Sequence, residues 1–219
     1  MYIDFITPLH KKTKRDYLGR VTGYPKAEAA KKARLFEYDY WDGDRNICYG
    51  GYYYDGRHKP VAEAMIRHYN LTNDSVILDM GCGKGFLLYE FTQLLPGITV
   101  VGFDISQYAL KNCKEEVKGD LIRGSADFLP FKSNSFDLVI SITTLHNLYC
   151  YQMASALKEI ERVSRDHAYI VVESYRNEEE KVNLLYWQVT CEGFYTPEEW
   201  VWWFDQTGYT GDYSFIYFE

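Results

Sequence analysis

Short apolar runs alternate with longer segments of helical periodicity from residue 60 onward. Apolar runs bounded by Gly, Asp or Asn are typical of buried strands, whereas apolar residues spaced three and four apart predict helices. Strands are therefore expected at Ser75–Asp79, Thr99–Asp104, Gly119–Gly124, Phe136–Ser141 and Ala168–Ser174, and helices at Pro60–Tyr69, Gly85–Leu95, Ser106–Lys118 and Gln152–Val163. This alternation predicts an α/β fold with a doubly wound, mostly parallel sheet and helices on both faces.

The C-terminal part of the chain is less regular. Residues Leu184–Cys191 fit either a strand or the continuation of a helix, and Thr196 opens a helical pattern over Pro197–Gln206. The last apolar run, Gly211–Phe218, predicts a final strand. We expect the last two strands to pair antiparallel, which places an antiparallel C-terminal strand at the sheet edge.

Residues 1–58 precede the alternating pattern and differ from it in composition. Good helix formers occupy Ala27–Tyr38, and residues 38–57 are dense in Tyr, Trp, Gly and Asp. Gly and Asp favour turns, and so many aromatic rings would not be left free in water. We therefore divide the chain into an aromatic-rich N-terminal segment, 1–58, and a main domain, 59–219. The segment is interpreted either as a lid over a ligand or as a cap that covers the sheet.

Composition is that of an ordinary globular protein. The 219 residues suffice for one domain with a real core, and 47% are hydrophobic while 25% are charged. The five cysteines are scattered without a Cys-x-x-Cys pair, which predicts reduced thiols in a cytoplasmic protein and neither a disulfide framework nor a zinc site. No apolar stretch has the length of a membrane span or the character of a signal peptide, so no membrane partner is expected.

The net charge of −7 disfavours general binding to nucleic acids. Its distribution is uneven, because nine basic and only two acidic residues lie between positions 11 and 34. Such a basic stretch is either a solvated helix face or a surface that attracts an anionic small molecule.

The turn after the first expected strand carries the strongest chemical signal. The apolar run ends at Asp79, and Gly81, Gly83 and Gly85 follow at the start of a helical pattern. Glycines let a chain turn sharply and approach a ligand at a helix N-terminus. A dinucleotide fingerprint would need a third glycine where Phe86 stands. The arrangement instead resembles motif I of the class I S-adenosylmethionine-dependent methyltransferases, which have a Rossmann-like fold.

This resemblance covers residues 75–175 and implies a set of cofactor contacts. Asp104 ends the second strand and can accept both ribose hydroxyls. In the family segment that precedes Leu-Pro-Phe, Asp127 would accept from the adenine amino group. The other implied contacts are Asp79 at the methionine ammonium, Gly81, Cys82, Gly83 and Gly85 in the turn, Ile105, Ser106, Ala126 and Phe128 beside the adenosine, and Ser141 at the end of the fourth strand.

Residues 141–147, Ser-Ile-Thr-Thr-Leu-His-Asn, follow the fourth strand, where the family usually brings the acceptor to the cofactor. They lack the Asn/Asp-Pro-Pro-aromatic motif of amino-methylating DNA enzymes, a Pro-Cys nucleophile and paired glutamates. Ser141 and Ser174 stand where metal-dependent catechol-type enzymes place carboxylates, so no metal is expected. His146 is the candidate base, because an imidazole titrates near neutral pH. Its alternative role is packing against the cofactor without proton transfer.

The aromatic stretch 38–57 supplies the remaining candidates, since aromatic faces can stabilise a sulfonium by cation–π contact. We expect acceptor contacts from Tyr40, Trp41, Asp42, Tyr54 and Arg57. Tyr53 and Asp44 join His146 as candidate catalytic residues, through polar contacts to the substrate.

These patterns predict an enzyme that transfers a methyl group from S-adenosyl-L-methionine to an O or N atom of a small molecule. A sugar or nucleotide sugar is the favoured acceptor, and an anionic group on it would suit the basic stretch. Nucleic acid is a disfavoured partner, and a monomer or homodimer is expected. The alternatives are a tRNA or protein methyltransferase, a non-catalytic S-adenosylmethionine-binding protein, and an enzyme that uses the same cofactor for decarboxylation or cyclisation.

Overall fold

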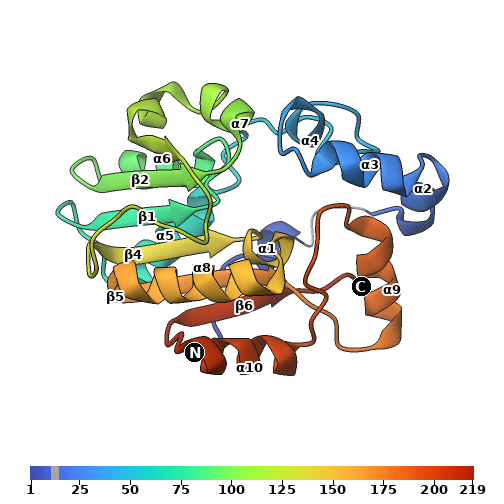
Figure 1. Cartoon of the computed structure of the whole chain (residues 1–219). Coiled ribbons are helices and arrows are strands. Elements are labelled where there is room, and N and C mark those ends of the chain that lie inside the picture. Colours follow the sequence, from blue (N-terminus) through green and yellow to red (C-terminus); the bar gives the residue numbers. More distant parts are fainter. Residues whose placement is uncertain (11–14) are drawn as a thin grey trace.

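The computed structural model describes residues 1–10 and 15–219, which form a six-stranded sheet with helices on both faces (Figure 1). The strand order is β3-β2-β1-β4-β5-β6, and every neighbouring pair is parallel. The strands are β1 (Val76–Met80), β2 (Thr99–Asp104), β3 (Leu121–Arg123), β4 (Phe136–Ile142), β5 (Ser164–Glu173) and β6 (Asp212–Ile216). The Rossmann-like α/β fold expected from the alternation is confirmed.

Helices precede, connect and follow these strands. They are α1 (Thr7–His10), α2 (Tyr17–Thr22), α3 (Lys26–Ala33), α4 (Tyr38–Trp41), α5 (Lys59–Tyr69), α6 (Phe86–Leu94), α7 (Gln107–Lys111), α8 (Cys150–Val163), α9 (Glu178–Trp187) and α10 (Pro197–Thr207), with 3-10 turns at Glu115–Asp120 and Leu145–Asn147. The helix expected over Ser106–Lys118 is thus shorter than predicted and is followed by a separate turn. Across the described ranges, none of the helices combines the length and apolar character that a membrane crossing needs.

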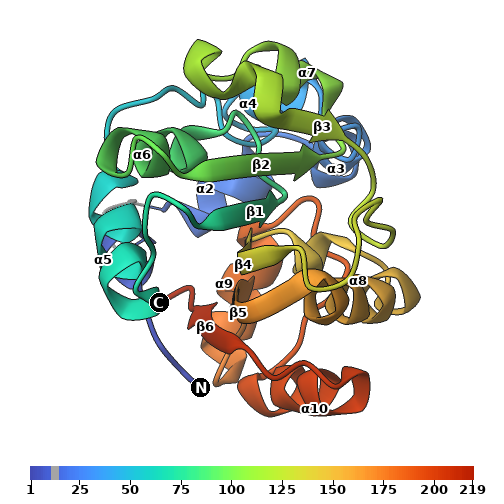
Figure 2. The ribbon, with the colours of Figure 1, turned by 90° about the vertical axis from the view of Figure 1, so that its left-hand side faces the viewer.

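Strand side chains alternate between two buried layers on opposite faces of the sheet. Ile77 and Ile140 pack on the face covered by α5 and α6, whereas Leu78 and Val139 pack on the face covered by α8 and α10 (Figure 2). Because both faces are covered, the strands read as nearly continuous apolar runs. This burial leaves the strand ends as the places where polar side chains can reach a ligand.

The C-terminal edge differs from the sequence expectation. Asn177 accepts a hydrogen bond from Glu180 N and caps α9, so that Leu184 is helical. The chain then forms α10, which begins with a capping box at Thr196. These helices return the chain to the end of the sheet where β5 began, and β6 pairs parallel to β5. The prediction of an antiparallel edge strand was wrong for this reason, since a parallel pair requires such a crossover.

The N-terminal segment packs on the main domain in two places. Its first residues cover the outer edge of β6, where Ile3 N donates to Tyr213 O at 2.9 Å. Helices α2, α3 and α4 lie beyond the carboxyl ends of the strands (Figure 1). There Ala33 and Trp41 share a small apolar core with Ala109 of α7 and with Val189. The segment is therefore held at the end of the sheet where ligands bind in such folds. The division at residue 58 stays a prediction.

The tryptophans of α10 provide a test of this packing. Trp200 is fully buried and its Nε1 donates to Glu173 O at 3.0 Å, whereas Trp202 is 54% exposed. We expect Trp200→Ala to lower the free energy of unfolding by about 3–5 kcal/mol, because it leaves a cavity under β5 and β6. Trp202→Ala is the matched control and should change it by less than about 0.5 kcal/mol. Urea unfolding measures both, and equal losses would contradict the observed orientation of α10.

Candidate cofactor and acceptor site

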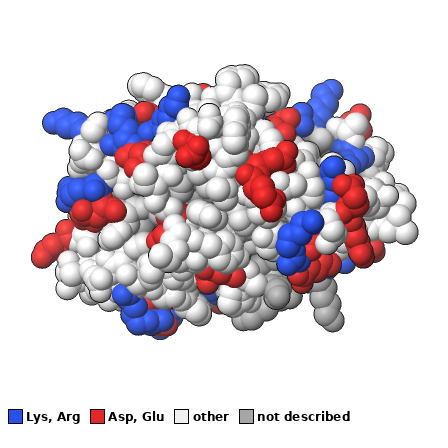
Figure 3. Space-filling model, turned by 90° about the horizontal axis from the view of Figure 1, so that it is seen from below, with Lys and Arg blue, Asp and Glu red and all other residues white. Residues whose placement is uncertain are grey.

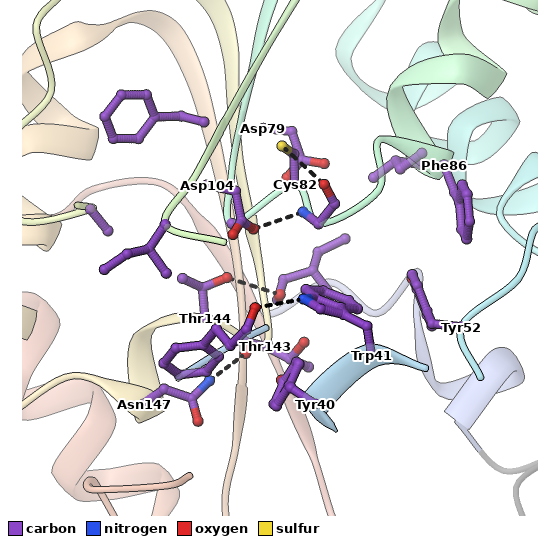
Figure 4. Close-up of a pocket in the computed structure, with 18 of the residues that line it drawn as sticks. Tyr40, Trp41, Tyr52, Asp79, Cys82, Phe86, Asp104, Thr143, Thr144 and Asn147 are labelled. Atoms are coloured by element: carbon purple, nitrogen blue, oxygen red, sulfur yellow. Dashed lines mark hydrogen bonds between the residues drawn. The ribbon is translucent and has the colours of Figure 1, made fainter. Parts of the chain in front are cut away.

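A cavity of about 290 Å³ opens beyond the carboxyl ends of β1, β2 and β4 (Figure 4). The sheet and its loops line it with Asp79, Gly81, Cys82, Gly83, Phe103, Asp104, Ile105, Gly124, Ser125, Ala126, Ile142, Thr143, Thr144, Asn147 and Leu148, and α6 adds Phe86 and Leu87. The N-terminal segment supplies Ile6, Leu9, His10, Phe36, Tyr40, Trp41, Tyr49, Tyr52, Arg57 and His58. Two parts of the chain that are distant in sequence thus enclose one space.

The glycine turn is shaped by close neighbours. Gly81 has a φ of 87°, and a Cβ there would lie 1.8 Å from Thr144 Oγ1. Gly83 has a φ of 55°, and its Cβ would lie 2.8 Å from the Trp41 ring. Both positions therefore require glycine for conformation and for space. Gly85 caps α6 and lies outside the cavity lining.

Asp79 presents a buried carboxylate to the cavity. The residue is 5% exposed and lines the cavity, and no described residue donates a hydrogen bond to its side chain. Burial and, to a smaller extent, the charge of Asp104 raise its pKa to about 7. A buried carboxylate in this state favours a cationic ligand, because a positive charge would offset the desolvation of the ionised form.

Asp104 is held rigidly in place at the end of β2. Its Oδ2 accepts from Gly83 N at 2.8 Å and its Oδ1 accepts from Ser106 N at 2.7 Å. Burial raises its pKa although these bonds lower it. Each oxygen can still accept a further hydrogen bond, as two neighbouring hydroxyls would supply. Ser106 lies outside the lining, because its hydroxyl caps α7 and accepts from Trp41 Nε1.

Only some of the residues predicted to contact the adenine ring line the cavity. Ile105 and Ala126 line it, but Asp127 and Phe128 do not. The Asp127 carboxylate accepts from Ser125 Oγ and from Gln152 Nε2, and Phe128 is 73% exposed. Ser125 therefore faces the cavity where Asp127 was expected.

The three candidate catalytic residues lie outside the cavity lining. His146 is 2% exposed, and its Nε2 lies 3.5 Å from Glu173 Oε2 behind the wall. Burial lowers the pKa of His146, so its ring is neutral at neutral pH. Tyr53 is 71% exposed, and Asp44 accepts from Asn46 N within a surface turn. Ser141, assigned to the cofactor, is also buried beneath the site. The geometry gives none of these side chains contact with a ligand in the cavity.

The predicted acceptor residues divide into two groups. Tyr40, Trp41 and Arg57 line the cavity, whereas Asp42 and Tyr54 do not. The Tyr54 hydroxyl donates to Oε1 of Glu90, a buried residue of α6, at 2.8 Å.

Asp42 instead accepts hydrogen bonds from Lys84 and Tyr108, and we call this group of three residues the clasp. Lys84 belongs to the glycine turn and is 3% exposed; its Nζ donates to both oxygens of Asp42, at 2.8 and 2.7 Å. Tyr108 OH donates to Asp42 Oδ2 at 2.9 Å. The lysine of the glycine turn therefore fastens the N-terminal segment and does not face the ligand.

Sequence reasoning missed several lining residues. Tyr49 and Tyr52 lie in the aromatic stretch that was singled out, and the Trp41 and Tyr49 rings stack at 5.5 Å. Nothing local distinguishes them from exposed Tyr53. His58 and His10 gave no signal at all, because only the fold brings them to the cavity. Burial lowers the pKa of each to about 4, so both rings are neutral at neutral pH.

Two arginines of the basic stretch contact other parts of the protein. Arg20 donates to Trp187 O and to Ile47 O, and Arg34 pairs with Glu192 at 2.8 Å. Lys11, Lys12 and Lys14 lie outside the described residues. The described part of the stretch therefore does not line the cavity.

The acid pair and the glycine turn fit one cofactor type. Asp79 can take an ammonium, Asp104 can accept two ribose hydroxyls, and Ile105 with Ala126 can border a base. Within residues 1–10 and 15–219, no three His, Cys, Asp or Glu side chains lie together as metal ligands would. The site therefore suits an adenosine that carries an amino-acid group.

Asp79→Asn should stabilise the ligand-free protein more at pH 8 than at pH 5. A raised pKa means that the native state binds more protons than the unfolded chain between pH 4 and 7, so the free energy of unfolding falls as the pH rises through this window. The Asn variant has no carboxyl group to titrate, so its free energy of unfolding does not fall in this way. The difference in free energy of unfolding between variant and wild type should therefore grow by roughly 1–3 kcal/mol from pH 5 to pH 8. Urea unfolding tests this, with exposed Asp74→Asn as control. A difference that does not depend on pH would contradict it.

Lys84→Met should weaken the attachment of the N-terminal segment. It leaves the largely covered Asp42 carboxylate without its cation, which costs about 2–4 kcal/mol of unfolding free energy. Adding Asp42→Asn should restore part of this loss. Lys118→Met, which removes a surface pair with Glu115, should cost less than about 1 kcal/mol. If Lys84→Met matched this control in thermal or urea unfolding, the clasp would have no structural importance.

Comparison with known proteins supports the cofactor type. Residues 78–172 match the protein family described as a methyltransferase domain. A tRNA (carboxymethyluridine(34)-5-O)-methyltransferase of Arabidopsis thaliana is 31% identical over 133 residues, which are 60% of this chain and 31% of that protein. Human mitochondrial arginine-hydroxylase NDUFAF5 is 38% identical over 92 residues, which are 40% of this chain and 25% of that protein. The chain therefore spans less than two thirds of the length of these relatives.

Solved structures agree in fold. A methyltransferase candidate from Bacillus halodurans C-125 superposes with a TM-score of 0.57 at 20% identity, covering 67% of this chain and 68% of that one. The sheet order, the acid pair at the glycine turn and the family match lead to one conclusion. The domain at residues 78–172 belongs to the class I S-adenosylmethionine-dependent methyltransferases, which use S-adenosylmethionine as methyl donor.

Proposed function

We propose that this protein transfers a methyl group from S-adenosylmethionine to an O or N atom of a small molecule, with a sugar or nucleotide sugar as the favoured acceptor. The observation that carries the proposal is the single cavity that joins Asp79 and Asp104 to the aromatic rings of the N-terminal segment. A cofactor held by the two acids and an acceptor held under the rings would share one enclosed space. Such alignment supplies much of the rate enhancement in a displacement reaction.

The cofactor, when bound, supplies an electrophilic methyl group on a sulfonium. Asp79 would hold its ammonium and Asp104 its ribose, which fixes the direction of the thioether arm. Tyr40, Trp41 and Tyr49 would exclude water and present aromatic faces to the positive sulfur. Thr143 and Asn147, in the segment that follows β4, border the space in which the acceptor would lie.

The proposed reaction does not depend on His146, because its ring lies behind the cavity wall. The same holds for Tyr53 and Asp44. An amine acceptor needs no base before attack, and a hydroxyl acceptor would need one from the lining or from water.

A second candidate is tRNA methylation. It is favoured by the Arabidopsis relative, whose name describes a tRNA methyltransferase. Against it stand the net charge of −7 and the alternation of acidic and basic side chains on the face seen in Figure 3. The name of the human relative, an arginine-hydroxylase, shows that a related domain is also associated with another reaction. The acceptor must therefore be identified by the product.

Methyl-labelled S-adenosylmethionine would decide between these functions. The purified protein is incubated with a small-molecule extract and, separately, with total tRNA, and labelled products are separated by mass spectrometry. We expect label in a small molecule, and at least tenfold less with Asp79→Asn, because the ammonium contact is lost. Label only in tRNA would establish the second candidate. Cofactor binding with no label in either fraction would contradict both.

A further inference from the structure

The amino-acid end of a bound S-adenosylmethionine carries a positive ammonium and a negative carboxylate. The contacts predicted from the sequence include a partner for the ammonium but none for the carboxylate. Asp79 can take the ammonium, but the carboxylate on the adjacent carbon also enters the cavity. The glycine turn and the ends of β2 and β4 contribute no cation to the lining. A partner for the carboxylate must therefore come from elsewhere in the described chain or from solvent. This argument rests on the cofactor of the proposed function.

Arg57 is the one Lys or Arg residue among the described residues that line the cavity. Its Nε and Nη2 donate to the carboxylate of Asp55, at distances from 2.6 to 2.9 Å. Nη1 has no partner among the residues that the structure describes. The guanidinium is thus held in one orientation by Asp55 while two of its donors stay available for a ligand.

Tyr52 and His58 line the same cavity as Arg57 and Asp79. Tyr52 OH lies 3.5 Å from His58 Nε2, and the Tyr52 ring stacks on Phe86 at 5.0 Å, where α6 leaves the glycine turn. The charge of Asp79 raises the pKa of Tyr52 and the charge of Arg57 lowers it, so both charges act on this one hydroxyl. The acid and the guanidinium therefore line one cavity, and Tyr52 lies in the electric field of both.

We propose that Arg57 binds the α-carboxylate of S-adenosylmethionine through Nη1, beside Tyr52 and His58. The N-terminal segment then completes the cofactor site as well as covering it. In this arrangement Arg57 recognises the cofactor, whereas the sequence alone had suggested an acceptor contact. The clasp holds the same segment in place, so the cofactor and the segment would stabilise each other's position.

Calorimetric binding of three ligands tests this role without any acceptor. They are S-adenosylhomocysteine, its decarboxylated analogue, and 5′-methylthioadenosine, which lacks the amino-acid group. Arg57→Gln should weaken S-adenosylhomocysteine binding about tenfold to hundredfold, as loss of a charge-assisted contact does. It should change the affinity for the other two ligands by less than about threefold. Arg57→Lys should recover part of the affinity for S-adenosylhomocysteine alone.

Arg34→Gln is the matched control, because Arg34 lies in the same segment and pairs with Glu192 away from the cavity lining. It should leave all three affinities unchanged, and thermal unfolding verifies that each variant is folded. Equal weakening of all three ligands by Arg57→Gln would overturn the proposal and indicate a structural role. An unchanged affinity for S-adenosylhomocysteine would also overturn it. Failure of the wild-type protein to bind any of the three would instead overturn the cofactor assignment itself.

Discussion

Two carboxylates that the fold forces together at the ends of adjacent strands are the constraint on which this structure depends. Asp79 is the next-to-last residue of β1, and Asp104 ends the neighbouring β2, which runs parallel to it. Both are almost completely buried, and burial raises the pKa of each. Asp104 is stabilised by two backbone amides, whereas no residue of the described ranges donates to the Asp79 side chain. The ligand-free protein therefore keeps an unfavourable charge that a cationic ligand would offset.

The glycine turn that follows β1, residues 81–85, forms the surroundings of the two acids. Gly81 and Gly83 allow Thr144 and Trp41 to approach the turn, which narrows the space beside the acids. Lys84, in the middle of the same turn, binds Asp42 of the N-terminal segment and not the ligand. One turn thus shapes the cofactor site and anchors the segment that covers it. A substitution that alters the anchoring of the segment should therefore also alter the cofactor site, because both depend on the backbone of this turn.

The parts predicted from sequence are those that local pattern determines. Apolar runs specify buried strands, and the residues that end them must lie at one edge of a parallel sheet. This reasoning led to Asp79, Asp104 and Ile105, which line the cavity. The direction of β6 could not be read in this way, because it depends on whether the chain at Leu184 is helix or strand. That choice is made by the cap at Asn177.

Side-chain roles in the N-terminal segment were the least predictable. Neighbouring tyrosines differ completely in environment, with Tyr52 in the cavity and Tyr53 71% exposed, and no period in the sequence separates them. His146 was chosen for its place after β4, yet the short helical turn there directs its ring toward Glu173. His58 reaches the cavity only because α5 begins beside the glycine turn. Such contacts follow from tertiary packing and not from local sequence.

A crystal structure of the protein with S-adenosylhomocysteine would test the central claim most directly. The account predicts that the ribose hydroxyls lie within hydrogen-bond distance of Asp104 and that the ammonium lies against Asp79, in the cavity roofed by Trp41 and Tyr52. A well-ordered ligand bound elsewhere, or bound here without a contact to either carboxylate, would contradict it.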